Sequence, residues 1–425
     1  MTTFALVDCN NFYASCEKLF RPDLRHVPLV VLSNNDGCIV ARSKEAKALG
    51  IKMGVPLHQV KDQLAYHNVA VFSSNYALYG DISNRVMETL AALAPAIEIY
   101  SIDEAFLDLT GVSNCMNLTE FGFQVKNTVQ KNVGIGVGVG IAPTKTLAKL
   151  ANHAAKQYPA TQGVVDLTAK ARQEKLLKLM PLKEVWGVGR KLCTRLQAQG
   201  IETAWDLANQ NPKTIRQKYS VVLERTVREL NGESCLSLEE IAPPKQQIVC
   251  SRSFGTRITQ LSDMQEAVAN HVARGAAKLR HEQQRCKHIS VFIHTSAYNP
   301  KEPHYSNHAS FQLPSPTNDT RILLTVANRL LKHIWQDGFN YARAGIMLSD
   351  FYPKGMEQAL LFESPSTFES RPKSAELMQL IDKLNQSKIG QIFFARQGIE
   401  NNWKMKRQRL SPSYTTDWKQ LPWVR

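Results

Sequence analysis

Three carboxylate residues stand in two apolar segments of the chain, where strands would normally bury their side chains. Asp8 lies in the run Phe-Ala-Leu-Val-Asp-Cys-Asn-Asn-Phe-Tyr at residues 4–13, and Asp103 with Glu104 interrupts an alternating run at residues 97–109. A charged group inside a buried strand is costly unless something compensates it, and divalent metal ions do so. Two metal ions roughly 4 Å apart can activate an attacking oxygen and stabilise a leaving one. The three carboxylates therefore predict phosphoryl-transfer chemistry.

The spacing at residues 97–109 predicts a hairpin. Neighbouring side chains of a regular strand point to opposite faces, so Asp103 and Glu104 can share one site only if the backbone turns there. Taken alone, the Asp-Glu pair could be a polar hairpin tip, and Asp8 could be a strand-end or capping residue. The joint occurrence of the two segments favours a metal site. Asp108 continues the alternation and is expected to face solvent.

The composition of the chain indicates what kind of molecule it binds and where in the cell it works. Lys and Arg number 52 against 37 Asp and Glu, a formal charge of +15, which indicates a polyanionic partner such as nucleic acid. The longest apolar stretch, residues 133–142, is far too short to span a membrane. The chain opens Met-Thr-Thr directly before an apolar strand, without a secretory signal pattern, and its 8 cysteines are scattered. We therefore expect reduced thiols and a cytoplasmic location.

The order of strands and helices through about residue 167 predicts an α+β sandwich with helices on one face of a mixed sheet. A helix is expected at residues 144–156, with Lys145, Lys149 and Lys156 on or near one face. After residue 168 the chain becomes helical. Turns at Gly187-Val188-Gly189 and at Gly200 would expose backbone N–H groups suited to a DNA phosphate, although ordinary helical-hairpin turns stay an alternative.

Residues 245–355 form a basic segment with 14 Lys and Arg, Arg252 among them, against 7 Asp and Glu. Three strands and two amphipathic helices are predicted there, which indicates a small α/β domain. A solvated charged surface is the alternative, but the concentration of charge favours a grip on the DNA backbone. The strands are expected at residues 248–254, 289–295 and 344–349, and the helices at residues 263–281 and 319–336.

These motifs together resemble those of Y-family translesion DNA polymerases over essentially the full length. The resemblance rests on the Asp8 segment, residues 101–106, residues 138–149 and the glycine turns. Residues 20–24, 33–37, 222–230 and 410–416 are similar to UmuC-type catalytic subunits of bacterial DNA polymerase V. The resemblance implies an α+β multidomain, right-hand polymerase that performs error-prone translesion synthesis in the SOS DNA damage response and mutagenesis. The implied domains are a palm (1–21 and 79–168), fingers (22–78), a helical thumb with helix-hairpin-helix turns (169–241), a little-finger DNA-binding domain (245–355) and a UmuC-type tail (356–425).

The resemblance also implies roles for individual residues. Asp8, Asp103 and Glu104 would be catalytic and would hold two Mg²⁺ ions with the backbone carbonyl of Cys9. Tyr13 would be a steric gate whose ring leaves no room for a ribose 2′-OH. The incoming nucleotide would contact Phe12, Tyr13, Lys44, Lys47 and Lys156. The template base would lie under Val40 and Ala41. The DNA backbone would contact Lys145, Lys149, Gly187, Gly189, Gly200 and Arg252. Many members carry Tyr and Arg where this chain has Lys44 and Lys47, and lysine lacks the bidentate fork of arginine.

The implied partners are primer-template DNA, a dNTP, a processed UmuD-type dimer, a RecA-type recombinase filament and a sliding clamp. Gln358, Leu361 and Phe362 resemble a clamp-binding peptide. The implied location is the bacterial cytoplasm, in association with the nucleoid. Two other classes of protein are alternatives. A nucleotide cyclase would need no grip on duplex DNA, and a catalytically silent DNA-binding scaffold would not need all three carboxylates.

Overall fold

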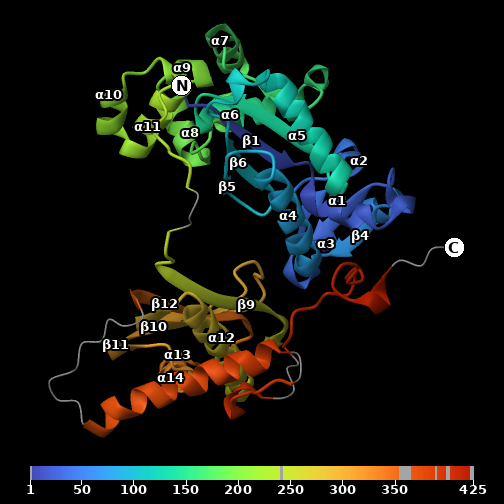
Figure 1. Ribbon diagram of the computed structural model, residues 1–425. Coiled ribbons are helices and arrows are strands. Elements are labelled where there is room, and N and C mark those ends of the chain that lie inside the picture. The colour runs from blue at the N-terminus through green and yellow to red at the C-terminus, as the bar shows by residue number, and fades with distance from the viewer. Residues whose placement is uncertain (1, 240–242, 354–364, 388–389, 399–402, 422–425) are drawn as a thin grey trace. The chain divides into compact units, whose positions relative to one another are not determined.

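The apolar run that contains Asp8 forms β1 (Phe4–Cys9), the central strand of a five-stranded sheet with the order β5-β6-β1-β7-β8. The computed structural model describes residues 2–239, 243–353, 365–387, 390–398 and 403–421. Two compact units divide the chain (Figure 1). The first unit comprises Met1–Ala242 and Gln408–Arg425, and the second comprises Pro243–Arg407.

In the part of the first unit that the structure describes, helices and strands are interspersed along residues 4–166, and a run of helices follows up to residue 230. They are β1, α1 (Phe12–Leu19), β2 (Leu29–Leu32), β3 (Ile39–Arg42), α2 (Lys44–Ala48), α3 (Leu57–Tyr66), β4 (Ala70–Ser73), α4 (Tyr76–Ala91), β5 (Ala96–Ile99), β6 (Glu104–Asp108), α5 (Leu118–Val133), β7 (Val137–Ala142), α6 (Lys145–Gln157), β8 (Val164–Asp166), α7 (Lys170–Leu179), α8 (Arg190–Gln197), α9 (Ala204–Ala208), α10 (Pro212–Lys218) and α11 (Val221–Leu230).

The five-stranded sheet is mixed, as expected, because β7 and β8 run parallel while its other pairs are antiparallel. The expectation of helices on one face is wrong. Ala5 and Val7 belong to a core with α4 and α5, whereas Phe4 and Leu6 belong to a second core with α6. Residues 4–7 are buried without interruption, which is typical of a strand covered on both faces.

A smaller sheet with the order β3-β2-β4 lies in the same unit, and all four residues of β2 are buried. Of the helices α8–α11, α8 begins directly after Gly189, and Gly200 lies between α8 and α9. Gly187 and Gly200 have φ values of 87° and 78°, in the left-handed region that glycine adopts without strain.

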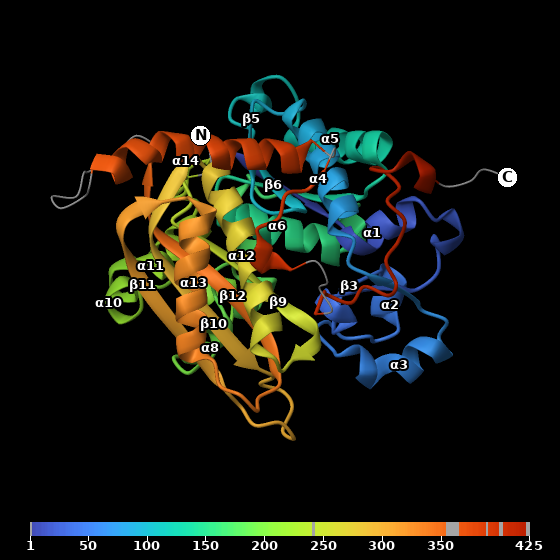
Figure 2. The same cartoon turned by 90° about the horizontal axis from the view of Figure 1, so that it is seen from below.

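The second unit is a four-stranded antiparallel sheet with the order β11-β10-β12-β9 and the helices α12 and α13 packed against it (Figure 2). The predicted strands and helices are present, but β11 was not predicted. The elements are β9 (Gln247–Ile258), α12 (Leu261–His281), β10 (Gln284–Thr295), β11 (Ser306–Thr317), α13 (Thr320–Ile334), β12 (Tyr341–Pro353) and α14 (Pro365–Gln386).

The 8 cysteines all lie in the described residues, and none of them forms a disulfide bond there. Every helix in the described residues is too short or too polar to traverse a lipid bilayer.

Close packing of α6 on β7 depends on Gly140. A Cβ atom built there would lie 2.1 Å from the backbone nitrogen of Asn152 and 2.5 Å from the carbonyl oxygen of Ala148. The Asn152 amide also donates to the carbonyl oxygens of Leu6 and Gly138, at 3.2 and 2.7 Å. The helix therefore rests directly on the two strands β1 and β7.

We expect Gly140→Ala to lower the free energy of unfolding of the first unit by about 3 kcal/mol, because backbone atoms would have to move apart. Gly80 in α4 provides the matched control, since a Cβ there meets nothing within 4 Å. Gly80→Ala should be neutral or slightly stabilising. Denaturant unfolding monitored by circular dichroism measures both, and equal effects of the two variants would contradict the packing argument.

Candidate functional site

Asp8 and Glu104 lie side by side on neighbouring strands. They are directly opposed in the antiparallel pairing of β1 with β6. Asp103 precedes Glu104 in the turn of the β5–β6 hairpin, and its carbonyl oxygen accepts a hydrogen bond from the Cys9 backbone nitrogen at 2.8 Å. The structure therefore brings the three predicted carboxylate residues and Cys9 to one place at the end of the central strand.

The Ser101 hydroxyl shapes the hairpin turn. It accepts hydrogen bonds from the backbone nitrogens of Asp103 and Glu104, at 3.2 and 3.1 Å, and donates to Asp103 Oδ1 at 2.7 Å. This local network turns the backbone between the two acidic residues, as their shared site requires. Asp108 lies further along β6, and its carboxylate accepts a hydrogen bond from Thr110 N.

Two lysines of α6 contact the carboxylates. Lys156 Nζ forms an ion pair with Asp8 Oδ1, and Lys149 Nζ lies 3.1 Å from Glu104 Oε2. Burial raises the pKa of the Asp8 carboxyl to about 7; the nearby Glu104 also raises it, and the Lys156 ammonium opposes both. Positive charge is thus needed at this cluster to keep Asp8 ionised near neutral pH.

In the described residues, no group of three or more His, Cys, Asp and Glu side chains is arranged as it would be around a metal ion. Lysine ammonium groups hold two of the three carboxylates instead. The donor set nevertheless fits a hard divalent cation, because it consists of carboxylate oxygens with a backbone carbonyl oxygen adjacent to them. Burial and acidic neighbours, both of which raise the pKa of Asp8, are the conditions that a bound cation would relieve.

Tyr13 lies in an aromatic cluster at the start of α1. Its ring stacks on the ring of Tyr79 with 4.4 Å between the centroids and 15° between the planes, and Tyr76 meets it edge-on at 6.2 Å. The nearby Asp103 contributes to raising the pKa of Tyr13, although burial is the main cause. The half-buried Tyr13 ring therefore lies near the carboxylates, while Phe12 is buried in the core beside it.

The other predicted nucleotide contacts come from the smaller sheet and α2. Val40 and Ala41 lie on β3, where Ala41 is buried and Val40 is half-buried. Lys44 and Lys47 are exposed on α2. Burial lowers the pKa of Lys47, as do the charges of Arg42 and Lys156, whereas Asp8 acts in the opposite direction. Lys47 therefore belongs to the same electrostatic environment as Asp8.

Lys145 and Lys149 differ sharply in their surroundings. Lys145 is 3% exposed, and its ammonium contacts Glu98 and the carbonyl oxygen of Ser237, the latter at 2.7 Å. Lys149 lies over the Tyr100 and Trp186 rings, at 4.3 and 5.2 Å from their centroids. In this conformation Lys145 is held inside the protein and its ammonium does not face solvent, in contrast with the DNA-backbone contact that the sequence suggested.

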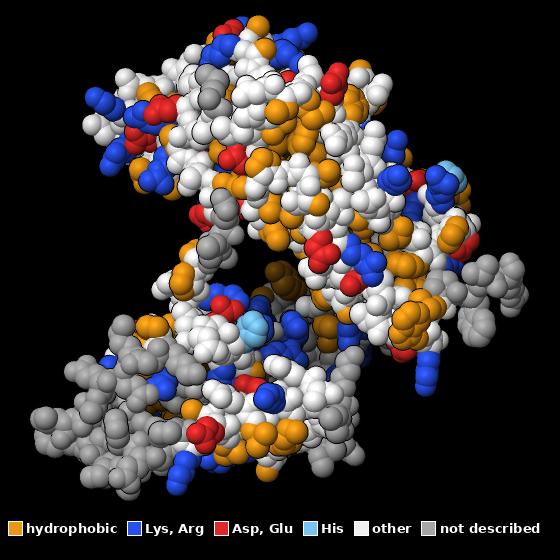
Figure 3. All heavy atoms as spheres, in the orientation of Figure 1, with side chains coloured by type: hydrophobic (Ala, Val, Ile, Leu, Met, Phe, Trp, Pro, Cys, Tyr) orange, Lys and Arg blue, Asp and Glu red, His pale blue; other side chains and the backbone are white. Residues whose placement is uncertain are grey.

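The remaining DNA-contact candidates are placed on the surface. Gly187 and Gly189 precede α8, Gly200 follows it, and Arg252 is exposed on β9. Basic side chains, mixed with acidic ones, also cover the part of the first unit that α10 and α11 form (Figure 3). Gln358, Leu361 and Phe362 lie outside the described residues.

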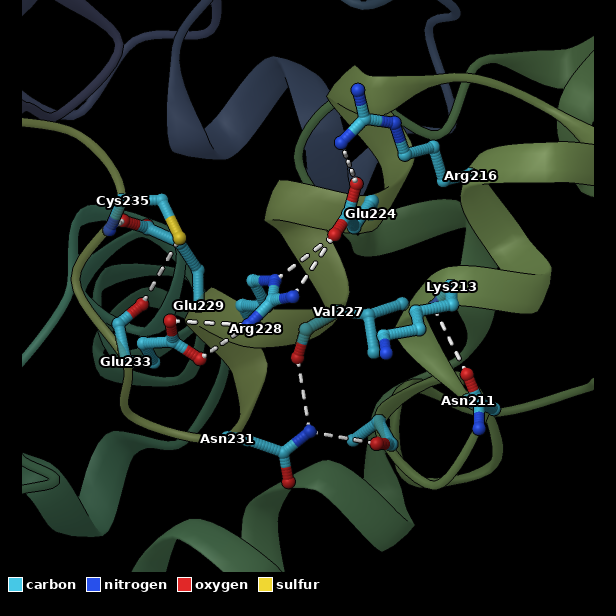
Figure 4. Close-up of polar contacts among 11 residues, drawn as sticks. Asn211, Lys213, Arg216, Glu224, Val227, Arg228, Glu229, Asn231, Glu233 and Cys235 are labelled. Atoms are coloured by element: carbon cyan, nitrogen blue, oxygen red, sulfur yellow. Dashed lines mark hydrogen bonds and ion pairs between the residues drawn. The ribbon is translucent and has the colours of Figure 1, made fainter.

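Sequence reasoning missed Glu229, which fixes the start of α6. The fully buried Glu229 carboxylate accepts from the backbone nitrogens of Thr146 and Cys235, each at 2.9 Å, while its carbonyl oxygen accepts from the Thr144 hydroxyl. Figure 4 shows Glu229, which lies on α11, beside Cys235. Its negative charge also suits the N-terminus of α6. Nothing in the sequence separates it from the solvated acids of an amphipathic helix such as α11.

Solved structures with the same fold are Y-family DNA polymerases. A Y-family DNA polymerase chimera matches with a TM-score of 0.66 and 20% identity, over 83% of this chain and all of that one. The insertion ternary complex of Dbh DNA polymerase matches with a TM-score of 0.55 and 22% identity, over the same shares. The fold is that of a Y-family DNA polymerase.

Sequence comparison identifies the family. The impB/mucB/samB family matches residues 7–153, its C-terminal domain matches residues 245–361, and a domain of unknown function (DUF4113) matches residues 375–424. Protein ImpB of Salmonella typhimurium is 53% identical over 99% of both chains, and Protein UmuC of Salmonella typhimurium is 53% identical over 98% of this chain and 99% of that one. DNA polymerase IV of Oceanobacillus iheyensis is 26% identical over 95% and 94%. The chain belongs to the impB/mucB/samB family, and the predicted class, an error-prone translesion DNA polymerase, is confirmed.

Proposed function

We propose that the carboxylate cluster on β1 and the β5–β6 hairpin is the catalytic centre of template-directed nucleotidyl transfer. Each cycle would join a primer 3′-OH to the α-phosphate of a dNTP and release pyrophosphate. The observation that carries this proposal is the direct cross-strand pairing of Asp8 with Glu104 beside Asp103, with Lys156 on the same cluster. Carboxylates and ammonium groups gathered in this way match the charges of metal-assisted transfer from a triphosphate.

Asp8, Asp103, Glu104 and the Cys9 carbonyl oxygen would hold two Mg²⁺ ions. When bound, the ions would supply Lewis-acid activation of the primer hydroxyl and stabilise the developing negative charge. The protein's own contribution is position and electrostatics. Lys156, once released from Asp8, would contact the triphosphate together with the exposed Lys47 and Lys44. Lysine ammonium groups bind phosphate as point charges and tolerate more than one approach.

The side chains beside the cluster would select the substrate. Tyr13 would lie under the sugar and exclude a 2′-OH, and the small Ala41 with Val40 would leave space over the template base. The five-stranded sheet would act as the palm, the β3-β2-β4 sheet as the fingers, α7–α11 as the thumb and residues 245–355 of the second unit as the little finger. The turns at Gly187, Gly189 and Gly200 would grip phosphates through backbone N–H groups.

Primer extension with purified full chain tests the proposal. We expect synthesis with dNTPs and Mg²⁺ on an undamaged template and across an abasic site, and no synthesis with a chelator. A processed UmuD-type dimer, a RecA-type recombinase filament and a sliding clamp are proposed partners and should each raise synthesis. Deletion of residues 358–362 should abolish clamp stimulation only. DNA binding without synthesis under every condition would contradict the proposed chemistry.

The proposed DNA grip predicts a steep salt dependence. The logarithm of the DNA association constant should fall with the logarithm of salt concentration, with a slope of about −0.9 for each phosphate neutralised. Arg252 is exposed on β9. Arg252→Ala should reduce the slope by about 1, whereas Arg252→Lys keeps the charge and should preserve it. Fluorescence anisotropy across a salt series measures both variants, and a flat profile for the wild type would exclude a grip based on charge.

A further inference from the structure

The C-terminal end of the chain packs onto the smaller sheet of the first unit. Gln408 N donates to Asp36 Oδ2 at 2.9 Å, Ser73 N donates to the Arg409 carbonyl oxygen at 2.9 Å, and Arg409 N donates to Ser73 Oγ at 3.0 Å. Ser73 ends β4, an edge strand of the β3-β2-β4 sheet. We call residues 408–417 the C-terminal brace, because they are bound to the edge of this sheet through Ser73.

The middle of the brace is buried against α1 and α4. Ser411 and Tyr414 are 4% and 6% exposed. The Ser411 hydroxyl accepts from the side-chain nitrogen of Asn75 at 3.0 Å and donates to Glu17 Oε1 at 3.1 Å. The Tyr414 ring stacks on Phe20 at 4.7 Å. These contacts tie the brace to both helices that carry the aromatic cluster around Tyr13.

Glu17 links the brace to that cluster. Its carboxylate is fully buried on α1, and Oε1 accepts from the Tyr79 hydroxyl at 2.6 Å as well as from Ser411. Burial raises the pKa of Glu17 to about 6, and the hydrogen bonds from Tyr79 and Ser411 oppose the rise. Glu17 Oε2 has no hydrogen-bond partner in the described residues. Because a buried carboxylate needs its donors, both hydroxyl groups are held firmly in place.

Tyr79 in turn supports the ring of Tyr13. The two rings are stacked, and Tyr76, one turn earlier on α4, meets Tyr13 edge-on. Asn75 caps this helix by accepting from Leu78 N at 3.2 Å while it donates to Ser411. Tyr76 and Tyr79 therefore both sit on the first turn of a helix whose cap is bound to the brace.

We infer that the C-terminal brace sets the position of the Tyr13 ring through Ser411, Glu17 and Tyr79, and thereby sets how strictly the sugar of the incoming nucleotide is selected. These three are positioning residues. The inference rests on the proposed role of Tyr13 as the steric gate. A residue more than 300 positions away in the sequence would thus tune selection at the nucleotide site.

Single-nucleotide insertion kinetics with the full chain test the inference. We expect Ser411→Ala and Tyr79→Phe each to lower the ratio of kcat/KM for dNTP over rNTP by about tenfold, since a charge-assisted hydrogen bond is lost in each. The change should appear mainly in KM, with kcat for dNTP within about twofold of the wild type. Ser411→Thr keeps the hydroxyl and should restore the ratio. Ser413→Ala is the matched control, because Ser413 uses backbone atoms for its hydrogen bonds to Gln420 and Thr416.

A double variant separates positioning from general damage to the fold. In a Tyr13→Ala background, Ser411→Ala should cause no further loss of sugar selection. If Ser411→Ala acted only by damaging the fold, its effect on sugar selection would add to that of Tyr13→Ala. If Tyr13→Ala relaxes selection while Ser411→Ala and Tyr79→Phe behave like Ser413→Ala, the inference is overturned and the gate stands. If Tyr13→Ala leaves selection unchanged, the gate assignment itself fails and the inference fails with it.

Discussion

Asp103→Asn is expected to lower the rate of primer extension roughly a thousandfold. If Asp103 helps to hold the cations as proposed, the loss of one carboxylate charge would weaken that hold and with it the stabilisation of the transition state. Asn is nearly isosteric with Asp, and its Oδ1 can still accept the hydrogen bond that the Ser101 hydroxyl now donates at 2.7 Å. The turn of the hairpin should therefore keep its shape. Affinity for primer-template DNA should stay within about twofold of the wild type, since the basic surfaces are untouched.

Asp108 offers a matched control on the same hairpin. It lies on β6, four residues after Glu104, and its carboxylate accepts a local hydrogen bond from Thr110 N at 2.8 Å. Asp108→Asn makes the same change of charge away from the cluster and should leave extension intact. Single-turnover extension and anisotropy together report rate and binding. If Asp103→Asn retained a tenth of the wild-type rate, the loss would be too small for a catalytic carboxylate, and Asp103 would not be one.

Tyr13→Ala is expected to raise ribonucleotide insertion about a hundredfold, which corresponds to the relief of a clash of about 3 kcal/mol. The half-buried ring stacks on Tyr79 and lies near Asp103, so its removal opens space next to the carboxylates. Insertion of dNTP should fall less than tenfold, because the chemistry does not use the phenol.

Tyr13→Phe controls for the hydroxyl group. It retains the ring and its stacking, so it should keep wild-type sugar selection. The ratio of kcat/KM for dNTP over rNTP, measured opposite one template base, compares the two variants. Equal selection by Tyr13→Ala and the wild type would show that another group excludes the 2′-OH.

The carboxylate cluster could be predicted because its signal is local. Asp103 and Glu104 interrupt an alternation of apolar and polar residues, and the two side chains can share one site only if the backbone turns there. Asp8 lies in a second strand, whose other side chains are apolar and must be buried. The structure places Asp8 opposite Glu104, in agreement with a shared site, while their role as metal ligands stays a prediction. The multidomain α+β class was implied by the resemblance to Y-family DNA polymerases, and the Y-family fold confirms it.

Other features depend on contacts between distant segments, which periodicity does not reveal. Lys145 falls on the expected helix, but its burial depends on Glu98 and the Ser237 carbonyl group. The strand β11 has alternating exposure and carries Pro314 and Pro316, which an edge strand tolerates but which weaken a strand signal. The buried Glu17 reads in sequence as one more surface acid of an amphipathic helix.

The return of residues 408–417 to the first unit makes the second unit an insertion, joined to the rest of the chain at both of its ends. A domain that is joined by a single linker separates from the protein when that linker is cleaved. Cleavage of one connection of the second unit would leave it covalently attached through the other. While the brace stays bound to the first unit, the second unit is attached at two points. It would move like a domain on a single linker only after the brace detached. If the second unit holds the duplex as proposed, a primer end that leaves the carboxylates stays at high effective concentration on the same molecule. On that proposal, chain connectivity as well as charge would favour rebinding of the same primer, and hence processivity.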